Sequence, residues 1–389
     1  MNPKIKVRPE DFRVEEVAAL PLVKAGAFGV YSLQKKLRNT VELLQELSRK
    51  LDIPFRDFSY GGRKDRHALT TQYITVRSSR RLSLEEENYS LRFVGYMRRP
   101  MGPDLIQDNR FEVTARKLGN GDITGAQDEL KNISACGFPN YFDDQRFGSF
   151  DSRQGFLAEK LLKQQFNGAL KIYLTSVHPN DEKEERRRKG LFVEYWKDWK
   201  ACRQHAKTRT EAEAFDTLIR KPAGLLEQLK KMPRNELSTY ISAYQSYLWN
   251  EVLRCFLKAV LPEQLRPCRG AAGEYFFYST VDPTNLRYLD KVYIPMPGAG
   301  LKIKDEIVRV IYSRVLQDNG IKMPMFNKLK LRQAFFKPFE RKAIVKPANL
   351  SVEPLADEIY PDEQKLILKF CLPRGSYATM FLKRIFSGL

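Results

Sequence analysis

The chain has 389 residues, which is too long for one ordinary hydrophobic core and predicts about two domains. Hydrophobic residues make up 42% and charged residues 29%, so the composition excludes a disordered protein. The excess of 67 Lys and Arg over 47 Asp and Glu gives a formal charge of +20, which favours a nucleic acid as partner over a basic surface kept for solubility.

Several protein classes are excluded by what the sequence lacks. The segment 1–12, MNPKIKVRPEDF, is charged from its fourth residue and has no apolar core, so we expect no secretory signal. No run approaches the roughly 18 apolar residues that a membrane span needs. The five cysteines and three histidines fit neither a disulfide framework nor a metal-ligand spacing. We therefore expect no membrane anchor, no metal and a reducing, cytoplasmic location.

The N-terminal third mixes short strands with a helix. Alternating apolar residues predict a strand at 30–34, and apolar residues at steps of three and four predict an amphipathic helix over 40–51. Strand-like runs follow at 72–78 and 111–118.

The middle of the chain is mostly helical in pattern. Residues 181–189, DEKEERRRK, are interpreted as a solvated helix face or loop, with an RNA contact from Arg186–Arg188 as the alternative. From 208 to 260 the pattern is helical, and an apolar stripe over 237–255 is typical of a core-facing helix. The last segment predicts a strand, a Pro/Gly corner and a closing helix.

Four stretches are richer in special residues than packing requires. Taken singly, each has an ordinary explanation: a core aromatic, a salt-bridged turn, a structural cation or a helix-starting loop. One of them places Asp65 between Lys64 and Arg66, directly after two glycines. The four stretches are RPEDFRVEEV (8–17), GGRKDRHALTTQY (61–73), PNYFDDQRFGSF (139–150) and LPRGSYATM (372–380).

In this order, the stretches resemble one family, the TruD-type pseudouridine synthases. The signatures are PEDFRVEE, GRKDRHALTTQ, NYFDDQRFG and LPRGSYAT, supported by SAYQSYLWN, PMPG and FERKAIVKP. The resemblance runs from about residue 5 to 385 and is looser from about 166 to 340. Two positions depart from the family pattern: Tyr377 stands where some relatives have Phe, and SFDSRQG follows QRFG. The pattern GxKDxxAxTxQ is satisfied at each fixed position, namely Gly62, Lys64, Asp65, Ala68, Thr70 and Gln72.

The resemblance implies an α+β fold with an inserted domain. The catalytic domain, a mixed sheet flanked by helices, would comprise residues 1–165 and 346–389. The inserted α+β (TRUD) domain would comprise residues 166–345 and form the second wall of an RNA-binding cleft.

The resemblance also implies the reaction and its residues. Asp65 matches the catalytic aspartate, and Lys6 and Lys64 match basic positions beside it. Four positions match residues that hold the target uridine: Phe12, Asn140, Phe142 and Tyr377. Bacterial members act on the uridine at position thirteen in the D arm of tRNA, and other members act elsewhere in tRNA or on other RNAs. Neither cofactor nor metal is implied.

This chemistry explains a lone aspartate among cations. Pseudouridine formation breaks the bond from C1′ to N1 and rejoins the uracil through C5, so it needs one ionised carboxylate, as nucleophile or as base at C2′. Adjacent cations favour the charged form. Extruding the base costs a few kcal/mol, which stacking on aromatic rings can offset at roughly 1–3 kcal/mol per base. Gly61 and Gly62 would allow close approach of the nucleotide.

Two rival functions remain open. One is an RNA-binding or RNA-folding protein in which Asp65 is idle. The other is a nuclease or deaminase, which the missing metal cluster and paired His/carboxylate groups disfavour. The sequence leaves the oligomeric state open, with a monomer favoured.

Overall fold

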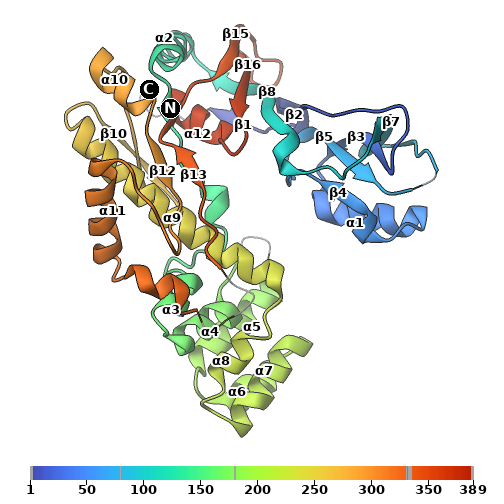
Figure 1. The fold of residues 1–389 in the computed structure, drawn as a ribbon, viewed down its shortest axis with the longest axis vertical. Helices are drawn as coiled ribbons and strands as arrows, with labels where there is room; N and C mark the ends of the chain where they lie inside the picture. The colour runs from blue at the N-terminus through green and yellow to red at the C-terminus, as the bar shows by residue number, and fades with distance from the viewer. Residues whose placement is uncertain (1–2, 79, 179–180, 330, 332–334, 387–389) are drawn as a thin grey trace. The chain divides into compact units, whose positions relative to one another are not determined.

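The computed structural model describes residues 3–78, 80–178, 181–329, 331 and 335–386 (Figure 1). Its contacts divide the chain into two compact units. The first unit comprises Met1–Phe138 and Val345–Leu389, and the second comprises Pro139–Ile344. The boundaries expected after residues 165 and 345 refer to the domains of the family, whereas these units are defined by contacts within the structure. The expected boundaries stay a prediction.

Within the described residues, the first unit is built on a ten-stranded sheet. Its main path runs β15–β16–β8–β2–β5–β3–β7–β6, with β1 paired to β8 and β4 paired to β5. The pairing of β2 with β5 is parallel and the other pairings are antiparallel, so the sheet is mixed, as predicted. The strands are β1 (Lys4–Ile5), β2 (Phe12–Ala18), β3 (Phe28–Lys36), β4 (Phe58–Tyr60), β5 (Leu69–Val76), β6 (Leu84–Glu86), β7 (Tyr89–Met97), β8 (Ile106–Leu118), β15 (Ala348–Ala356) and β16 (Gln364–Pro373).

Helix α1 (Thr40–Leu51) has the bounds that its apolar spacing predicts. Asn39 caps its start by accepting a hydrogen bond from the Val41 amide at 2.9 Å, and Asp52 ends it in the left-handed conformation. Its apolar face joins a core with residues of the sheet, and Figure 1 shows α1 lying along this part of the sheet. The core includes Tyr31, Leu33, Leu43, Leu44, Leu47, Ile74 and Leu91.

The segment after residue 345 completes the first unit. Strand β16 pairs with β8 over most of its length, so the two ends of the chain share one sheet. Helix α12 (Ala378–Phe386) packs on that sheet through Phe381, whose ring lies 4.3 Å from Phe370, and contacts helix α2 (Asn120–Cys136). This arrangement confirms the predicted α+β fold with a strand, a corner and a closing helix at its end.

The second unit is organised around the long helix α9 (Arg234–Val260). Its apolar stripe is buried, as predicted, apart from half-buried Cys255, and two of its buried side chains hold loops through hydrogen bonds. The Trp249 indole donates to the Ile294 carbonyl at 2.9 Å, and the Gln245 amide donates to the carbonyls of Pro297 and Lys337 at 2.6 and 2.9 Å. The helix therefore fixes the PMPG turn and the segment that precedes β13.

The remaining described elements are as follows. Short strands are β9 (Phe138–Pro139), β10 (Arg266–Gly270), β11 (Gly273–Phe277), β12 (Tyr293–Pro295), β13 (Glu340–Lys342) and β14 (Ile344–Val345). Helices are α3 (Leu157–Leu162), α4 (Phe166–Thr175), α5 (Lys183–Glu194), α6 (Trp199–His205), α7 (Arg209–Arg220), α8 (Leu225–Leu229), α10 (Pro283–Leu289) and α11 (Glu306–Asp318). Single-turn 3₁₀ helices are η1 (Pro9–Asp11), η2 (Phe55–Asp57), η3 (Pro103–Leu105), η4 (Asp144–Phe147) and η5 (Met323–Asn327).

The charged run at 181–189 enters helix α5. Arg188 pairs with Glu211 of α7 at 3.0 Å and so joins two helices, whereas Lys189 pairs with Asp181 at 2.7 Å, just before the start of its own helix. The alternative RNA contact of Arg186–Arg188 stays a prediction. Among the described residues, no helix combines the length and the apolar character needed to cross a membrane.

Candidate active site

The loop 61–68 lies where three strands of the first unit meet. It connects β4 to β5, and the parallel pairing of β5 with β2 sets Leu69 beside Arg13. The antiparallel pairing of β5 with β3 sets the same end of β5 beside Lys35 and Lys36. The sheet register therefore brings the start of β2, with Phe12, and the end of β3 to the loop that carries Asp65.

Asp65 is held by one lysine that is distant in the sequence. The Lys6 ammonium donates to the Asp65 carboxylate and forms an ion pair with it, and the His67 amide donates to the other carboxylate oxygen at 3.0 Å. Burial raises the pKa of Asp65, but the hydrogen bond and charge of Lys6, with the His67 amide, outweigh it and hold the pKa below its usual value. The carboxylate is therefore ionised at neutral pH.

Lys6 reaches Asp65 from an unusual backbone conformation. It follows β1 and has a φ of 62°, in the left-handed region that side-chain-bearing residues rarely adopt. Its ammonium also lies 4.3 Å from the centroid of the Phe12 ring, whose edge meets Phe111. Lys6, Phe12 and Asp65 thus form one contact group, and Phe12 is only 4% exposed.

Lys64 is directed elsewhere. Its ammonium lies 2.8 Å from a carboxylate oxygen of buried Glu16 and donates to the Asn109 side chain at 2.5 Å. Glu16 also accepts the Tyr73 amide at 3.2 Å. Lys64 therefore anchors the loop to β2 and β8 through side chains, while the cation on the Asp65 carboxylate is Lys6.

The fixed positions of the loop pattern have local structural reasons. The Gln72 amide donates to the Gly62 carbonyl at 3.3 Å and accepts from the Thr40 hydroxyl at 3.0 Å. That hydroxyl in turn accepts the Lys64 amide at 3.3 Å. Ala68 is fully buried. The loop backbone is therefore fixed by buried side chains of α1 and β5.

The two glycines of the loop differ. A side chain at Gly61 would collide with Ile106 and approach the Gly102 carbonyl oxygen to 3.1 Å, so packing against the start of β8 requires glycine there. At Gly62 an added Cβ would meet no atom within 4 Å. Close approach of a nucleotide at this position stays a prediction.

Tyr377 lies in the corner between β16 and α12. Gly375, with a φ of 88°, makes the corner, and the Tyr377 carbonyl accepts the amides of Met380 and Phe381 at the start of α12. Register connects this corner to the loop, because Leu372 pairs with Asn109, the residue that accepts from Lys64. The Tyr377 side chain is half-buried.

Asn140 and Phe142 lie in the second unit, where Arg341 of β13 holds them together. Its guanidinium donates to the Asn140 carbonyl at 2.7–2.8 Å and to the Asn140 side chain at 2.6 Å. The same guanidinium lies 4.2 Å from the centroid of the Phe142 ring, which meets Trp249 edge-on. Asn140 and Phe142 are 4% and 5% exposed, so both are packed in place.

The structure therefore places the seven predicted residues in two groups. Lys6, Phe12 and Asp65 touch one another directly or through Lys6, and Lys64 and Tyr377 belong to the same unit. Four structural partners were not predicted: Glu16, Lys35, Asn109 and Arg341. The sequence contained a signal for Lys35, because it lies two residues after Leu33 and four after Tyr31 in an alternating strand. All three side chains therefore point to the same, buried face of β3.

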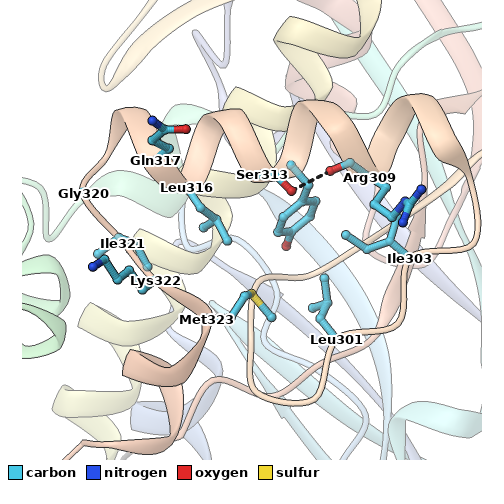
Figure 2. Close-up of a pocket in the computed structure, with 11 residues that line it drawn as sticks. Leu301, Ile303, Arg309, Ser313, Leu316, Gln317, Gly320, Ile321, Lys322 and Met323 are labelled. Carbon is cyan, nitrogen blue, oxygen red and sulfur yellow. Dashed lines mark hydrogen bonds between the residues drawn. The ribbon is translucent and has the colours of Figure 1, made fainter.

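A pocket of about 460 Å³ lies in the second unit beside α11, lined mainly by apolar side chains such as Leu301, Leu316 and Met323 (Figure 2). It contains no predicted site residue. Within the described part of the chain, no three His, Cys, Asp or Glu side chains gather into a group that could hold a metal ion.

Comparison with known proteins finds the same resemblance along nearly the whole chain. The family model described as "tRNA pseudouridine synthase D (TruD)" matches residues 1–270 and 281–385. The chain is 32% identical to "Probable tRNA pseudouridine synthase D 1" of Methanococcus maripaludis, over 99% of this chain and 100% of that protein. It is 29% identical to "tRNA pseudouridine synthase D" of Aquifex aeolicus, over 99% and 98% of the two chains.

A solved structure has the same fold. The crystal structure of a Methanosarcina mazei protein described as a putative tRNA pseudouridine synthase D superposes with a TM-score of 0.74 at 25% identity. The match covers 99% of this chain and 93% of that chain.

Proposed function

Because the chain belongs to the TruD family of tRNA pseudouridine synthases, we propose that it isomerises the uridine at position thirteen in the D arm of tRNA. In this proposal Asp65 is the single catalytic carboxylate, and no cofactor or metal takes part. The observation that carries the assignment is the Asp65 carboxylate, which Lys6 keeps ionised on a loop fixed by buried side chains.

The reaction requires a carboxylate without a proton. The C1′–N1 bond of uridine breaks and a C1′–C5 bond forms, while the hydrogen on C5 is lost to water and N1 gains a proton. Asp65 can start this in two ways: by attacking C1′ to form a glycosyl ester, or by removing the C2′ proton, which is later returned. Both routes need the ionised form that the lowered pKa of Asp65 supplies.

Uridine-binding roles follow from the exposure of the rings. A base can stack only on an accessible face, and Tyr377 is more exposed than Phe12 or Phe142. We therefore assign the first base contact to Tyr377. Phe12 contributes by supporting Lys6, and Phe142 and Asn140 contribute as a preformed pair clamped by Arg341.

The test is tritium release from tRNA labelled at C5 of uridine. Purified protein should release tritium from a tRNA pool, and Asp65→Asn should lower the rate by about 10³-fold or more while tRNA affinity is retained. A tRNA with cytidine at position thirteen should release none. Absence of release from every tRNA pool would overturn the reaction, an active Asp65→Asn variant would overturn the residue, and release from the cytidine tRNA would overturn the position.

A further inference from the structure

Lys35 is a fully buried lysine beneath the Asp65 loop. It is the second-to-last residue of β3, and its side chain has 0% exposure. A buried ammonium is costly unless its donors are satisfied, so its partners identify its role. Its Nζ donates to the carbonyl of Asp65 at 2.8 Å and to that of Arg38 at 2.7 Å, with the Lys64 carbonyl at 3.5 Å.

These partners are backbone carbonyls rather than the carboxylate itself. Thr40 and Gln72 fix the Lys64 amide and the Gly62 carbonyl, but the contact on the carbonyl of residue 65 is made by Lys35. The carboxylate is joined to that backbone by only two single bonds. Fixing the carbonyl therefore limits where the carboxylate can point.

The two lysines on Asp65 differ in what they would do when RNA enters. Lys6 contacts the reacting carboxylate and keeps 20% of its side chain exposed, so a ribose must share or displace it. Lys35 is enclosed by protein, and its ammonium donates to backbone carbonyls. The pKa of Lys35 is lowered to about 8, mainly by burial; the charge of Lys64 adds to the lowering and the Asp65 carboxylate opposes it. Lys35 is therefore mainly charged at pH 7 and keeps its three donors.

We propose that Lys35 is a positioning residue, which holds the backbone of Asp65 so that its carboxylate meets the ribose of the target nucleotide. The inference rests on the proposed function, because it assigns Lys35 a role through Asp65. A displacement of about 1 Å at a reacting group can cost about 10²-fold in rate. Loss of Lys35 should therefore slow the chemical step and leave tRNA binding intact.

The test compares Lys35→Met with Lys36→Met. Methionine has a similar length and no donor. Lys36, the next residue on β3, is partly exposed and pairs with Glu10 at 2.6 Å, so its substitution removes the same charge without touching the loop. In single-turnover reactions at saturating enzyme, Lys35→Met should be about 10- to 100-fold slower, and its steady-state KM should stay within about twofold of wild type. Lys36→Met should stay within about twofold in both.

A second variant and a second measurement separate positioning from folding. Lys35→Gln keeps an N–H donor and should be slowed less than Lys35→Met. Hydrogen exchange of the peptide 61–67 should be faster in Lys35→Met than in wild type, with exchange of the α1 peptide 40–51 unchanged.

Each outcome decides the proposal. It is overturned if Lys35→Met keeps the wild-type rate, if its defect lies in KM alone, or if Lys36→Met is slowed equally. It is also overturned if neither Lys35 variant folds, because Lys35 would then serve stability alone. If wild-type protein releases no tritium, the proposed function fails, and hydrogen exchange still tests the contact of Lys35 with the loop. Unchanged exchange of peptide 61–67 in Lys35→Met would overturn that contact.

Discussion

Lys6 and Asp65 are hydrogen-bonded and ion-paired although they lie 59 residues apart in the chain. Lys6 adopts its left-handed conformation immediately after β1, so the short pairing of β1 with β8 ends where the side chain must turn toward the loop. Backbone strain of this kind is typical of functional sites. In the free protein, this conformation places the Lys6 ammonium on the Asp65 carboxylate, whose pKa burial alone would raise.

Replacing Lys6 should move the acid limb of the reaction. A carboxylate with a lowered pKa stays ionised as the pH falls, so kcat/KM of wild type should be flat between about pH 5 and 7. In Lys6→Met, burial acts without that opposing cation and raises the pKa of Asp65. The value of kcat/KM should therefore decline as the pH falls from about 7 to about 5. Lys4→Met, on the exposed side of β1, should keep the flat profile. A flat profile in Lys6→Met would contradict the coupling.

Phe142→Leu tests whether that ring does more than pack. Leucine keeps most of the volume but loses the edge contact with Trp249 and the face contact with Arg341, which together contribute about 1–3 kcal/mol of unfolding free energy. If the ring also holds the uridine, the single-turnover rate should fall by about 5- to 150-fold.

The control for Phe142→Leu is Phe147→Leu, another buried phenylalanine of the same segment, which meets Phe156. It should lower stability and leave the rate unchanged. Denaturant unfolding and single-turnover kinetics measure the two effects. Equal rates for both variants and wild type would make Phe142 a core residue only.

The family and the fold class could be predicted because their signals are local. The 40–51 helix is fixed by its own apolar spacing, and it appears with the same bounds as α1. The strand expected over 111–118 begins earlier, at Ile106 of β8. Four of its first five residues, IQDNR, are polar, and one of them, Asn109, is buried and accepts a hydrogen bond from Lys64. Because polar residues occupy this part of the strand, the apolar pattern does not reveal where β8 begins.

The residues that contact Lys64 and Asp65 could not be predicted from the sequence, because the register of the sheet determines which side chains meet. Lys64 is next to Asp65 in sequence, yet its side chain is directed to Glu16 and Asn109. The cation on Asp65 comes from Lys6, and the anchor on its carbonyl comes from Lys35, which β3 delivers by pairing with β5. Ring exposure is likewise a tertiary property.

Arg341→Met should destabilise the second unit. Its guanidinium satisfies the carbonyl and side chain of Asn140, and leaving buried acceptors unpaired costs about 1–3 kcal/mol. Lys342→Met is the matched control, because that side chain is exposed on the same strand and its backbone carbonyl, which accepts from Asn140, is kept. Denaturant unfolding should show a lower unfolding free energy for Arg341→Met alone. Equal unfolding free energies in the two variants would contradict the clamp.

Arg116 of β8 connects the two chain segments of the first unit. Its buried guanidinium donates to Asp11, which precedes Phe12, at 2.7–3.1 Å. It also donates to Asp357 at 2.9 Å and Glu358 at 3.0 Å, which lie beyond the second unit in sequence. Burial raises the pKa of Asp357, but the Ile359 and Lys117 amides and Arg116 outweigh it, so the pKa is lowered overall.

Arg116→Met should therefore lower the unfolding free energy by about 3–5 kcal/mol at pH 7, because two buried carboxylates lose their cation. A carboxylate whose pKa is lowered by folding contributes stability above its unfolded pKa of about 3.9 and loses it as the pH falls below that value, so the deficit should be smaller at about pH 3 than at pH 7. Arg110→Met removes the exposed pair with Glu15 and a side-chain contact with Cys371, and should cost less than about 1 kcal/mol. Urea unfolding at both pH values measures this, and a deficit independent of pH would show that Arg116 acts through packing instead of charge.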